Sequence, residues 1–395
     1  MSPMHDHGLI TTTSDLEAFV QTLSENSWVA VDTEFMREKT YHPQLCLIQL
    51  ATLEHIGCID PLALTELGPL VALLNDPDIL KVFHAASQDM EVLYHVTGKV
   101  PAPVFDTQIA ASLLGHGEQI GYANLVQNVL NHELDKTQAR TDWSRRPLHS
   151  GQLVYARDDV RYLARMFVLL REELSDAGRL EWLQPEMDAL SRAENYRPDP
   201  EGAWRRVGGH KRMKPKELAV LRELAAWREK EALALDRPRR WILSDDVLVA
   251  AARQRPSDRR ALQDLRGFPK TLRDHQVDTL LEAVQKGIAA PRESWPEVAR
   301  PRSLTEAEEV IADMALALLR ELARLQRVGP EAVGSRRDVI ALIRGDETAA
   351  LARGWRRQVA GQELQRWLAG ETQLRCAGRE IEIRNPEAHP LARPH

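Results

Sequence analysis

Two acidic side chains lie in the stretch Trp28–Phe35 (WVAVDTEF), which has the alternation of a β-strand. Asp32 and Glu34 fall on one face of that strand, about 6 to 7 Å apart. Two adjacent carboxylates in a buried strand lose hydration and repel each other unless a cation lies between them. Divalent cations such as Mg²⁺ bind carboxylate oxygens, so the stretch predicts a metal site. The alternative is an edge strand with a solvated polar face.

Three more residues could complete this site. Asp89 lies in the acidic first turn of a helix that directly follows the β-rich run of residues 79–85. Asp159 borders the apolar stripe of a long helix predicted for residues 151–174, and Tyr155 precedes it by one turn. A strand, a strand-to-helix junction and a later helix must therefore bring these side chains together.

The elements that carry these residues indicate a mixed α/β domain. An antiparallel meander is followed by strands that alternate with helices, which is typical of a mixed sheet covered by helices. The meander strands are predicted at residues 28–35, 45–52 and 55–60.

Two all-helical regions follow the α/β domain. The first opens with an amphipathic helix at residues 216–234, and Trp204, Trp227 and Trp241 are expected in its core. Pro-rich stretches at residues 196–202 and 290–301 separate the parts. The expected units are residues 1–200, 210–290 and 301–375, with a tail at residues 376–395.

Charge is distributed unevenly along the chain. The 395 residues carry a net charge of −6. Residues 1–200 hold 15 lysines and arginines against 29 aspartates and glutamates, whereas residues 201–275 hold 19 against 11. An acidic part followed by a basic one is typical of a protein that binds metal in one place and a polyanion in another.

The sequence also indicates the compartment of the protein. No apolar run reaches membrane-spanning length, and the N-terminus lacks the layout of a signal peptide. Cys46, Cys58 and Cys376 show no C-x-x-C spacing, which argues against a cysteine-based metal site. We therefore expect a cytoplasmic protein without membrane contact, and nothing requires more than a monomer.

The ordered set of four acids and a tyrosine resembles the DEDD superfamily of 3′→5′ exonucleases, in the branch with a tyrosine four positions before the last aspartate. Val154 stands where the other branch has a histidine. Several motifs resemble bacterial ribonuclease D: VDTEF at 31–35, FHAASQD at 83–89, FDTQI at 105–109 and YARDD at 155–159. The helical regions resemble HRDC domains, with WILSD at 241–245 in the first and SRRD at 335–338 in a second, more divergent one.

This resemblance implies a ribonuclease H-like fold that binds two Mg²⁺ or Mn²⁺ ions. Asp32 would bridge both ions, Glu34 and Asp159 would complete one site, and Asp89 would hold the other. Such a cation pair activates a water and stabilises the attacking and leaving oxygens of a phosphodiester displacement. Tyr155 would orient the attacking water. The implied activity is release of nucleoside 5′-monophosphates from the 3′ ends of tRNA precursors and other small structured RNAs.

Further residues are candidate RNA contacts, each with a structural alternative. His84 could contact the terminal nucleotide or hydrogen-bond near the strand end. Phe35 could stack on the terminal base or pack in the core. The remaining candidates are basic residues that could contact phosphates or form a solvated face: Lys211, Arg212, Arg239 and Arg240.

Two other functions stay open on the sequence. The same fold and acidic quartet serve in exonucleases that act on DNA, and nothing here separates ribose from deoxyribose. The second is a nucleic-acid-binding protein with an inactive nuclease domain. A missing carboxylate would have indicated that case, and all four are present.

Overall fold

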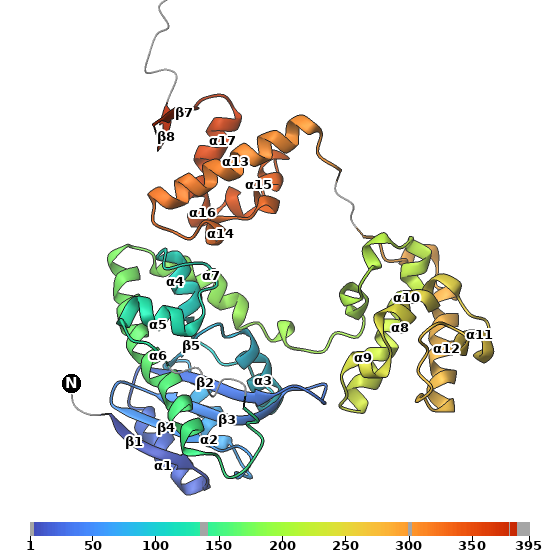
Figure 1. Cartoon of the computed structure of the whole chain (residues 1–395), viewed down its shortest axis with the longest axis horizontal. Helices are drawn as coiled ribbons and strands as arrows, with labels where there is room; N and C mark the ends of the chain where they lie inside the picture. The colour runs from blue at the N-terminus through green and yellow to red at the C-terminus, as the bar shows by residue number, and fades with distance from the viewer. Residues whose placement is uncertain (1–3, 135–140, 299–301, 379, 385–395) are drawn as a thin grey trace, which may run out of the picture.

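A mixed β-sheet is the centre of the N-terminal part of the molecule, residues 4–196 (Figure 1). The computed structural model describes residues 4–134, 141–298, 302–378 and 380–384. Within them this sheet has the strand order β1-β4-β3-β2-β5-β6. The strands are β1 (His5–Ile10), β2 (Trp28–Met36), β3 (Gln44–Ala51), β4 (His55–Ile59), β5 (Leu80–Phe83) and β6 (Val104–Asp106). The predicted meander is confirmed, because β2, β3 and β4 pair antiparallel, while the other pairs are parallel.

Helices cover both faces of the sheet. They are α1 (Thr13–Leu23), α2 (Gly68–Leu74), α3 (Ser87–Thr97), α4 (Thr107–Leu113), α5 (Tyr122–Leu130), α6 (Ser150–Asp176) and α7 (Leu180–Leu190). Helix α6 packs across β2, β3, β4 and β5. Its predicted apolar stripe is confirmed, since Ala156, Val160, Leu163, Phe167 and Leu170 are all buried. Strand β3, which lies between two strands, is buried from Leu45 to Ala51 and is correspondingly apolar in sequence.

An arginine fixes the start of α6 against the sheet. The Arg146 side chain donates from Nε to Asp60 Oδ2 at 2.6 Å and from Nη2 to the Cys46 carbonyl at 2.7 Å. Asp60 follows β4 directly and its side chain is 3% exposed. The loop that leads into α6 is thereby tied to both β3 and β4.

The first helical bundle, residues 203–298, has a hydrophobic core of its own. Its α-helices are α8 (Pro215–Ala234), α9 (Arg239–Ile242), α10 (Asp245–Gln254), α11 (Arg259–Gln263) and α12 (Asp274–Ala289). The prediction of an amphipathic α8 is wrong, because the helix is the centre of the bundle and even Glu223, Arg228 and Glu229 are buried in it. Trp241 was also predicted wrongly, since its side chain is 58% exposed.

The C-terminal part, residues 302–384, is mostly helical. It contains α13 (Glu306–Leu325), α14 (Pro330–Val333), α15 (Arg336–Ile343), α16 (Gly354–Arg356), a π-helical turn (Arg357–Gly361) and α17 (Gln362–Leu368). A hairpin of β7 (Gln373–Ala377) and β8 (Glu380–Arg384) follows. No sequence signal predicts this hairpin, which begins just before the expected tail. Among the described helices, none has the length and the apolar character needed to span a membrane.

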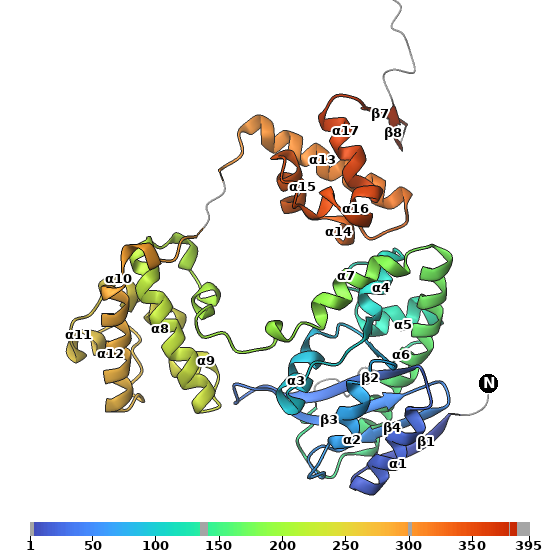
Figure 2. The same cartoon turned by 180° about the vertical axis from the view of Figure 1, so that it is seen from behind.

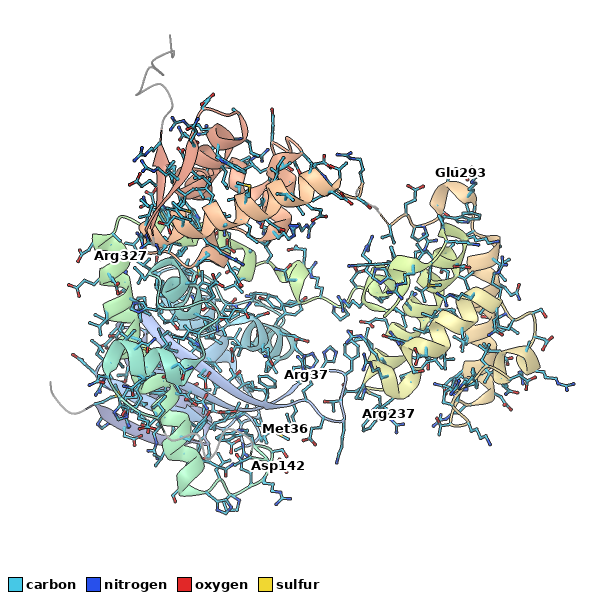
Figure 3. The ribbon with its side chains drawn as sticks, turned by 45° about the horizontal axis from the view of Figure 1, so that its top comes forward. Met36, Arg37, Asp142, Arg237, Glu293 and Arg327 are labelled. Atoms are coloured by element: carbon cyan, nitrogen blue, oxygen red, sulfur yellow. The ribbon has the colours of Figure 1, made fainter. Side chains whose placement is uncertain are left out.

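The two helical parts attach to the N-terminal part at different places (Figure 2). The C-terminal part packs near α4 and α7, where Trp182 stacks on Trp355 with ring centroids 4.7 Å apart. Arg327 lies at this boundary (Figure 3), and its carbonyl accepts from Arg179 at 3.2 Å. The first helical bundle instead meets the β2–β3 loop, residues 37–43. There the Tyr41 hydroxyl donates to Glu229 Oε1 at 2.5 Å and accepts from Arg239 Nη2 at 2.7 Å.

Candidate active site

The acidic residues lie where β2 extends beyond its neighbour β5. Strand β2 pairs with β5 only through residues 28–30, so Asp32 and Glu34 stand past the last paired residue. From α6, Asp159 reaches the same place. Carboxylate oxygens of Asp32, Glu34 and Asp159 all lie within 4.8 Å of one another, and we call this group the three-carboxylate cluster.

The environment raises the pKa of every acid in the cluster. Loss of hydration and repulsion by Asp32 raise the pKa of Glu34 to about 10. Loss of hydration raises the pKa of Asp159 to about 8, against the lowering effect of a hydrogen bond from Tyr155. Burial and the nearby Asp159 also raise the pKa of Asp32. A divalent cation would offset these penalties, because it stabilises the charged form of each acid.

Asp89 stands beside the cluster and not within it. Its side chain, in the first turn of α3, is 8% exposed. The Thr33 hydroxyl donates to Asp89 Oδ1 at 2.5 Å. Burial and the charge of Asp32 raise the pKa of Asp89 as well. The structure thus brings three of the four predicted acids together and places the fourth on the same cavity.

That cavity has a volume of about 310 Å³ and opens to solvent. It is formed by β2, the end of β5, α3, α5 and α6. Its lining residues are Asp32, Thr33, Glu34, Phe35, His84, Ala85, Gln88, Asp89, Tyr122, Tyr155, Asp159 and Leu163.

Two tyrosines hold α6 and its carboxylate in place. The Tyr155 hydroxyl hydrogen-bonds to the Asp159 side chain, which is the arrangement expected from their spacing of one helical turn. Tyr122 in α5 donates to the backbone carbonyl of Asp159. The sequence contains no signal for Tyr122, because no spacing rule links α5 to α6 across the residues between them.

His84 and Phe35 both line the cavity, and they differ in the contacts that their rings make within the protein. The His84 ring nitrogens are both engaged within the protein, Nδ1 with Thr107 Oγ1 at 3.0 Å and Nε2 with the Ile120 carbonyl at 3.1 Å. Burial lowers the pKa of His84. These contacts favour its structural alternative. Phe35 is half-buried and packs against the core, and the Arg37 guanidinium lies 6.0 Å from the centre of its ring.

The basic candidates fall into two groups. Arg239 is engaged by Glu229, with Nε–Oε2 at 2.5 Å, and its guanidinium lies 4.4 Å from the centre of the Tyr41 ring. It therefore joins the first helical bundle to the β2–β3 loop. Lys211, Arg212 and Arg240 are exposed on the bundle surface.

Buried polar atoms without partners lie close to this site. Gln49 in β3 is fully buried, and among the residues that the structure describes neither its Nε2 nor its Oε1 has a hydrogen-bond partner. The indole N–H of Trp143 is likewise buried and unpartnered, and its ring centroid is 6.1 Å from that of Tyr155. Sequence reasoning missed Gln49, because its position beside Asp32 depends on the pairing of β2 with β3.

Comparisons with known proteins agree with this geometry. Residues 8–175 match the model of a 3′-5′ exonuclease family, and residues 217–284 match that of the HRDC domain. Ribonuclease D of Bartonella henselae is 38% identical over 92% of this chain and 90% of its own length. Ribonuclease D of Zymomonas mobilis is 42% identical over 91% and 93%. The crystal structure of Escherichia coli RNase D, an exoribonuclease involved in structured RNA processing, aligns with a TM-score of 0.78 at 30% identity, over 92% of this chain and 99% of that one.

Proposed function

Because this chain belongs to the ribonuclease D family of 3′→5′ exoribonucleases, we propose that it trims the 3′ ends of tRNA precursors and other small structured RNAs. The products would be nucleoside 5′-monophosphates. The observation that carries the proposal is the three-carboxylate cluster at the open end of β2. The protein would act as a monomer in the cytoplasm.

The cluster, together with Asp89, would hold two divalent metal ions, Mg²⁺ or Mn²⁺. Its oxygens are hard ligands, they lie within 4.8 Å of one another, and burial disfavours their charged forms without a cation. Asp32, Glu34 and Asp159 would hold the ions together with Asp89. When bound, the ions would supply an activated water and stabilise charge on the phosphodiester oxygens.

The remaining residues of the cavity would position the substrate and the water. The Tyr155 hydroxyl, which hydrogen-bonds to Asp159, would hold the attacking water beside the phosphate. This assignment puts the chain in the tyrosine branch of the DEDD enzymes. Phe35 would stack on the terminal base at the rim, and His84 would support the cavity wall through its bonds to Thr107 and Ile120.

The helical parts would hold the body of the RNA. We propose the division into an exonuclease domain (1–200), a first HRDC domain (210–290) and a second, divergent HRDC-like domain (301–375). The exposed Lys211, Arg212 and Arg240 support phosphate contacts on the first helical bundle. Arg37, Arg197, Arg206 and Arg239 also line a cavity of about 750 Å³ between this bundle and the N-terminal part, which supports an RNA path there.

Digestion of a 3′-extended tRNA tests this function. With Mg²⁺ or Mn²⁺, the chain should shorten the RNA stepwise from its 3′ end and release 5′-monophosphates, and chelation of the metal should stop it. A DNA oligonucleotide of the same sequence, digested alongside, tests the preference for ribose. Failure to shorten the RNA with either metal would refute the proposal, and faster digestion of DNA would replace it with a DNA exonuclease.

A further inference from the structure

Gln49 is a polar residue buried without partners in an otherwise apolar strand. Its side chain has no exposed surface, and both of its polar atoms lack hydrogen bonds within the described part of the chain. Buried side-chain amides are nearly always paired, because an unpaired one loses hydration without compensation. From Leu45 to Ala51 the strand carries no other polar side chain. An apolar residue at position 49 would therefore suit the folded, metal-free chain better than glutamine does.

The register of the sheet places Gln49 directly beside Asp32. The two residues oppose each other in the antiparallel β2–β3 pair. Opposed residues point to the same face, with Cβ atoms about 4.5–5.5 Å apart. On its other side Gln49 opposes Cys58 of β4, whose thiol is only a weak hydrogen-bonding group. Asp32 is thus the strong acceptor within reach of the Gln49 amide.

The same face of the sheet carries the rest of the site. Helix α6 packs over β2, β3 and β4 there, and its Asp159 completes the three-carboxylate cluster. The apolar neighbours of Gln49 on this face, Leu47 and Cys58, pack with Ala156 of α6. Gln49 consequently lies beside the cluster, on β3, whereas the lining of the open cavity comes from β2 and from the end of β5 on the other side of β2.

We propose that Gln49 is a positioning residue for the metal-binding carboxylates: its amide N–H donates to the Asp32 carboxylate, directly or through one buried water, and fixes the orientation of that carboxylate. The inference rests on the proposed metal-dependent function. A hydrogen bond to an ionised carboxylate is short and strong, and partners of this kind orient metal ligands. This role explains why the chain has a glutamine at position 49, although burying its unpaired amide lowers the stability of the metal-free chain.

Calorimetric titration of Mn²⁺ into the full chain, together with urea unfolding in EDTA, tests the inference. Gln49→Met keeps the volume and removes the polar atoms. It should weaken Mn²⁺ binding by about 10- to 100-fold, while the urea midpoint in EDTA stays equal or rises. Gln49→Leu also removes both polar atoms and should weaken Mn²⁺ binding as well, so the test does not depend on one variant.

Gln276→Met is the matched control. Gln276 is also buried, at 6% exposure, but its Nε2 donates to Glu231 at 2.6 Å in the first helical bundle. This variant should lower the urea midpoint and leave Mn²⁺ affinity unchanged. Wild-type Mn²⁺ affinity in either Gln49 variant, or a fall in midpoint for Gln49→Met like that of the control, would overturn the inference alone. If the wild-type chain binds no Mn²⁺, both this inference and the proposed function are overturned.

Discussion

The three-carboxylate cluster opposes folding unless a cation is bound. Its acids share one small, poorly hydrated space, which raises the pKa of Asp32, Glu34 and Asp159 alike. The proposed metal binding therefore requires these acids, whereas the same acids lower the stability of the metal-free chain. Removing one acid should cost activity and at the same time relieve the repulsion in the metal-free chain.

Asp32→Asn tests both consequences. The amide keeps the shape of the side chain but removes the charge that the metal ions need. Changing a residue that only hydrogen-bonds to a metal ligand typically lowers metal affinity or activity by about 10- to 100-fold. Asp32 is expected to bind the metal itself, so we expect the rate of 3′-end trimming to fall by more than about 100-fold. The urea midpoint in EDTA should rise, because one buried acid is gone. Trimming rates on a 3′-labelled RNA and unfolding curves measure the two effects, and a lower midpoint would contradict the repulsion.

Tyr155→Phe separates water positioning from metal binding. The ring and its packing remain, but the hydroxyl that bonds to Asp159 is lost. We expect kcat to fall by about 100-fold, the lower range for a lost acid–base or water-orienting group. Mn²⁺ affinity should stay unchanged. Tyr162→Phe is the control on the same helix, since Tyr162 stacks on His132 away from the cavity, with ring centroids 4.5 Å apart. An equal loss in both variants would contradict the role of Tyr155.

Residues within one element were predictable from the sequence, whereas contacts between elements were not. The strand period places Asp32 and Glu34 together, and the helix period places Tyr155 one turn from Asp159. The bond from Thr33 to Asp89 depends on how α3 meets β2. The position of Gln49 beside Asp32 depends on strand register. No local pattern in a single sequence specifies such contacts.

At the scale of elements, the Arg146–Asp60 pair is the main tie between the sheet and the start of α6. Asp60 is 3% exposed and Arg146 is 27% exposed. Arg146→Met should lower the free energy of unfolding by about 2–3 kcal/mol, less than for a fully buried pair, because the arginine is partly solvated. Urea unfolding measures the change. Arg145→Met is the control, since Arg145 is 84% exposed and pairs only locally with Asp142.

The same pair predicts how stability responds to acid. The hydrogen bonds and charge of Arg146 lower the pKa of Asp60 below its usual value. A carboxyl group whose pKa is lower in the folded state contributes stability above the unfolded pKa of about 3.9 and loses it as the pH falls through the folded value. The difference in stability between wild type and Asp60→Asn should therefore be full at pH 6 to 7 and shrink below about pH 4. A difference that is constant with pH would contradict the ion pair.

Some features of the fold escaped prediction because their surroundings determine them. Strand β1 (HDHGLI) has almost no apolar character, yet it pairs in parallel with β4 at the edge of the sheet. Helix α8 carries charged residues all round and is still buried, because Glu229 and Arg228 find partners in Arg239 and Asp245. Trp241 is exposed although tryptophan is usually buried. In each case tertiary contacts override local preference.

At the scale of the whole molecule, the two helical parts differ in their dependence on the N-terminal part. The first helical bundle has a separate core, whereas the apolar residues of the C-terminal part, such as Leu319 and Trp355, form one cluster with those of the N-terminal part. Deleting residues 302–395 should therefore destabilise the N-terminal part and spare the bundle. The stack of Trp182 on Trp355 and the Arg356–Glu186 ion pair, at 2.6 Å, are lost with the deletion.

Scanning calorimetry measures that difference. We expect the transition of the N-terminal part to fall by about 5 °C or more, since about 1 kcal/mol shifts the midpoint of a domain of this size by about 2–4 °C. The transition of the bundle should keep its midpoint. The deletion of residues 203–395 provides the comparison, because it removes the bundle too. A shift of both transitions on removing residues 302–395 would contradict the independence of the bundle.

At the same scale, we expect the RNA beyond the cavity to follow the β2–β3 loop to the first helical bundle. Strand β2 leaves the active site at Phe35, and the loop that follows it docks through Tyr41 on Arg239 of α9. Two residues further, Trp241 is 58% exposed beside the exposed Arg240, which is a setting suited to a base and its phosphate. We expect Trp241→Ala to weaken binding of a single-stranded RNA of about 12 nucleotides by about 5- to 150-fold, the range for one lost stacking contact.

Anisotropy of labelled RNA, measured in the Asp32→Asn chain to prevent digestion, gives this affinity. A dinucleotide fills only the cavity, so its binding should not respond to Trp241→Ala. Trp241→Phe should restore most of the affinity for the longer RNA, because the aromatic face is kept. Ile288→Ala is the control for removing exposed apolar surface from the bundle, since Ile288 is 43% exposed on α12. Equal losses for both RNA lengths, or a loss in Ile288→Ala as large as in Trp241→Ala, would show that the RNA does not run along α9.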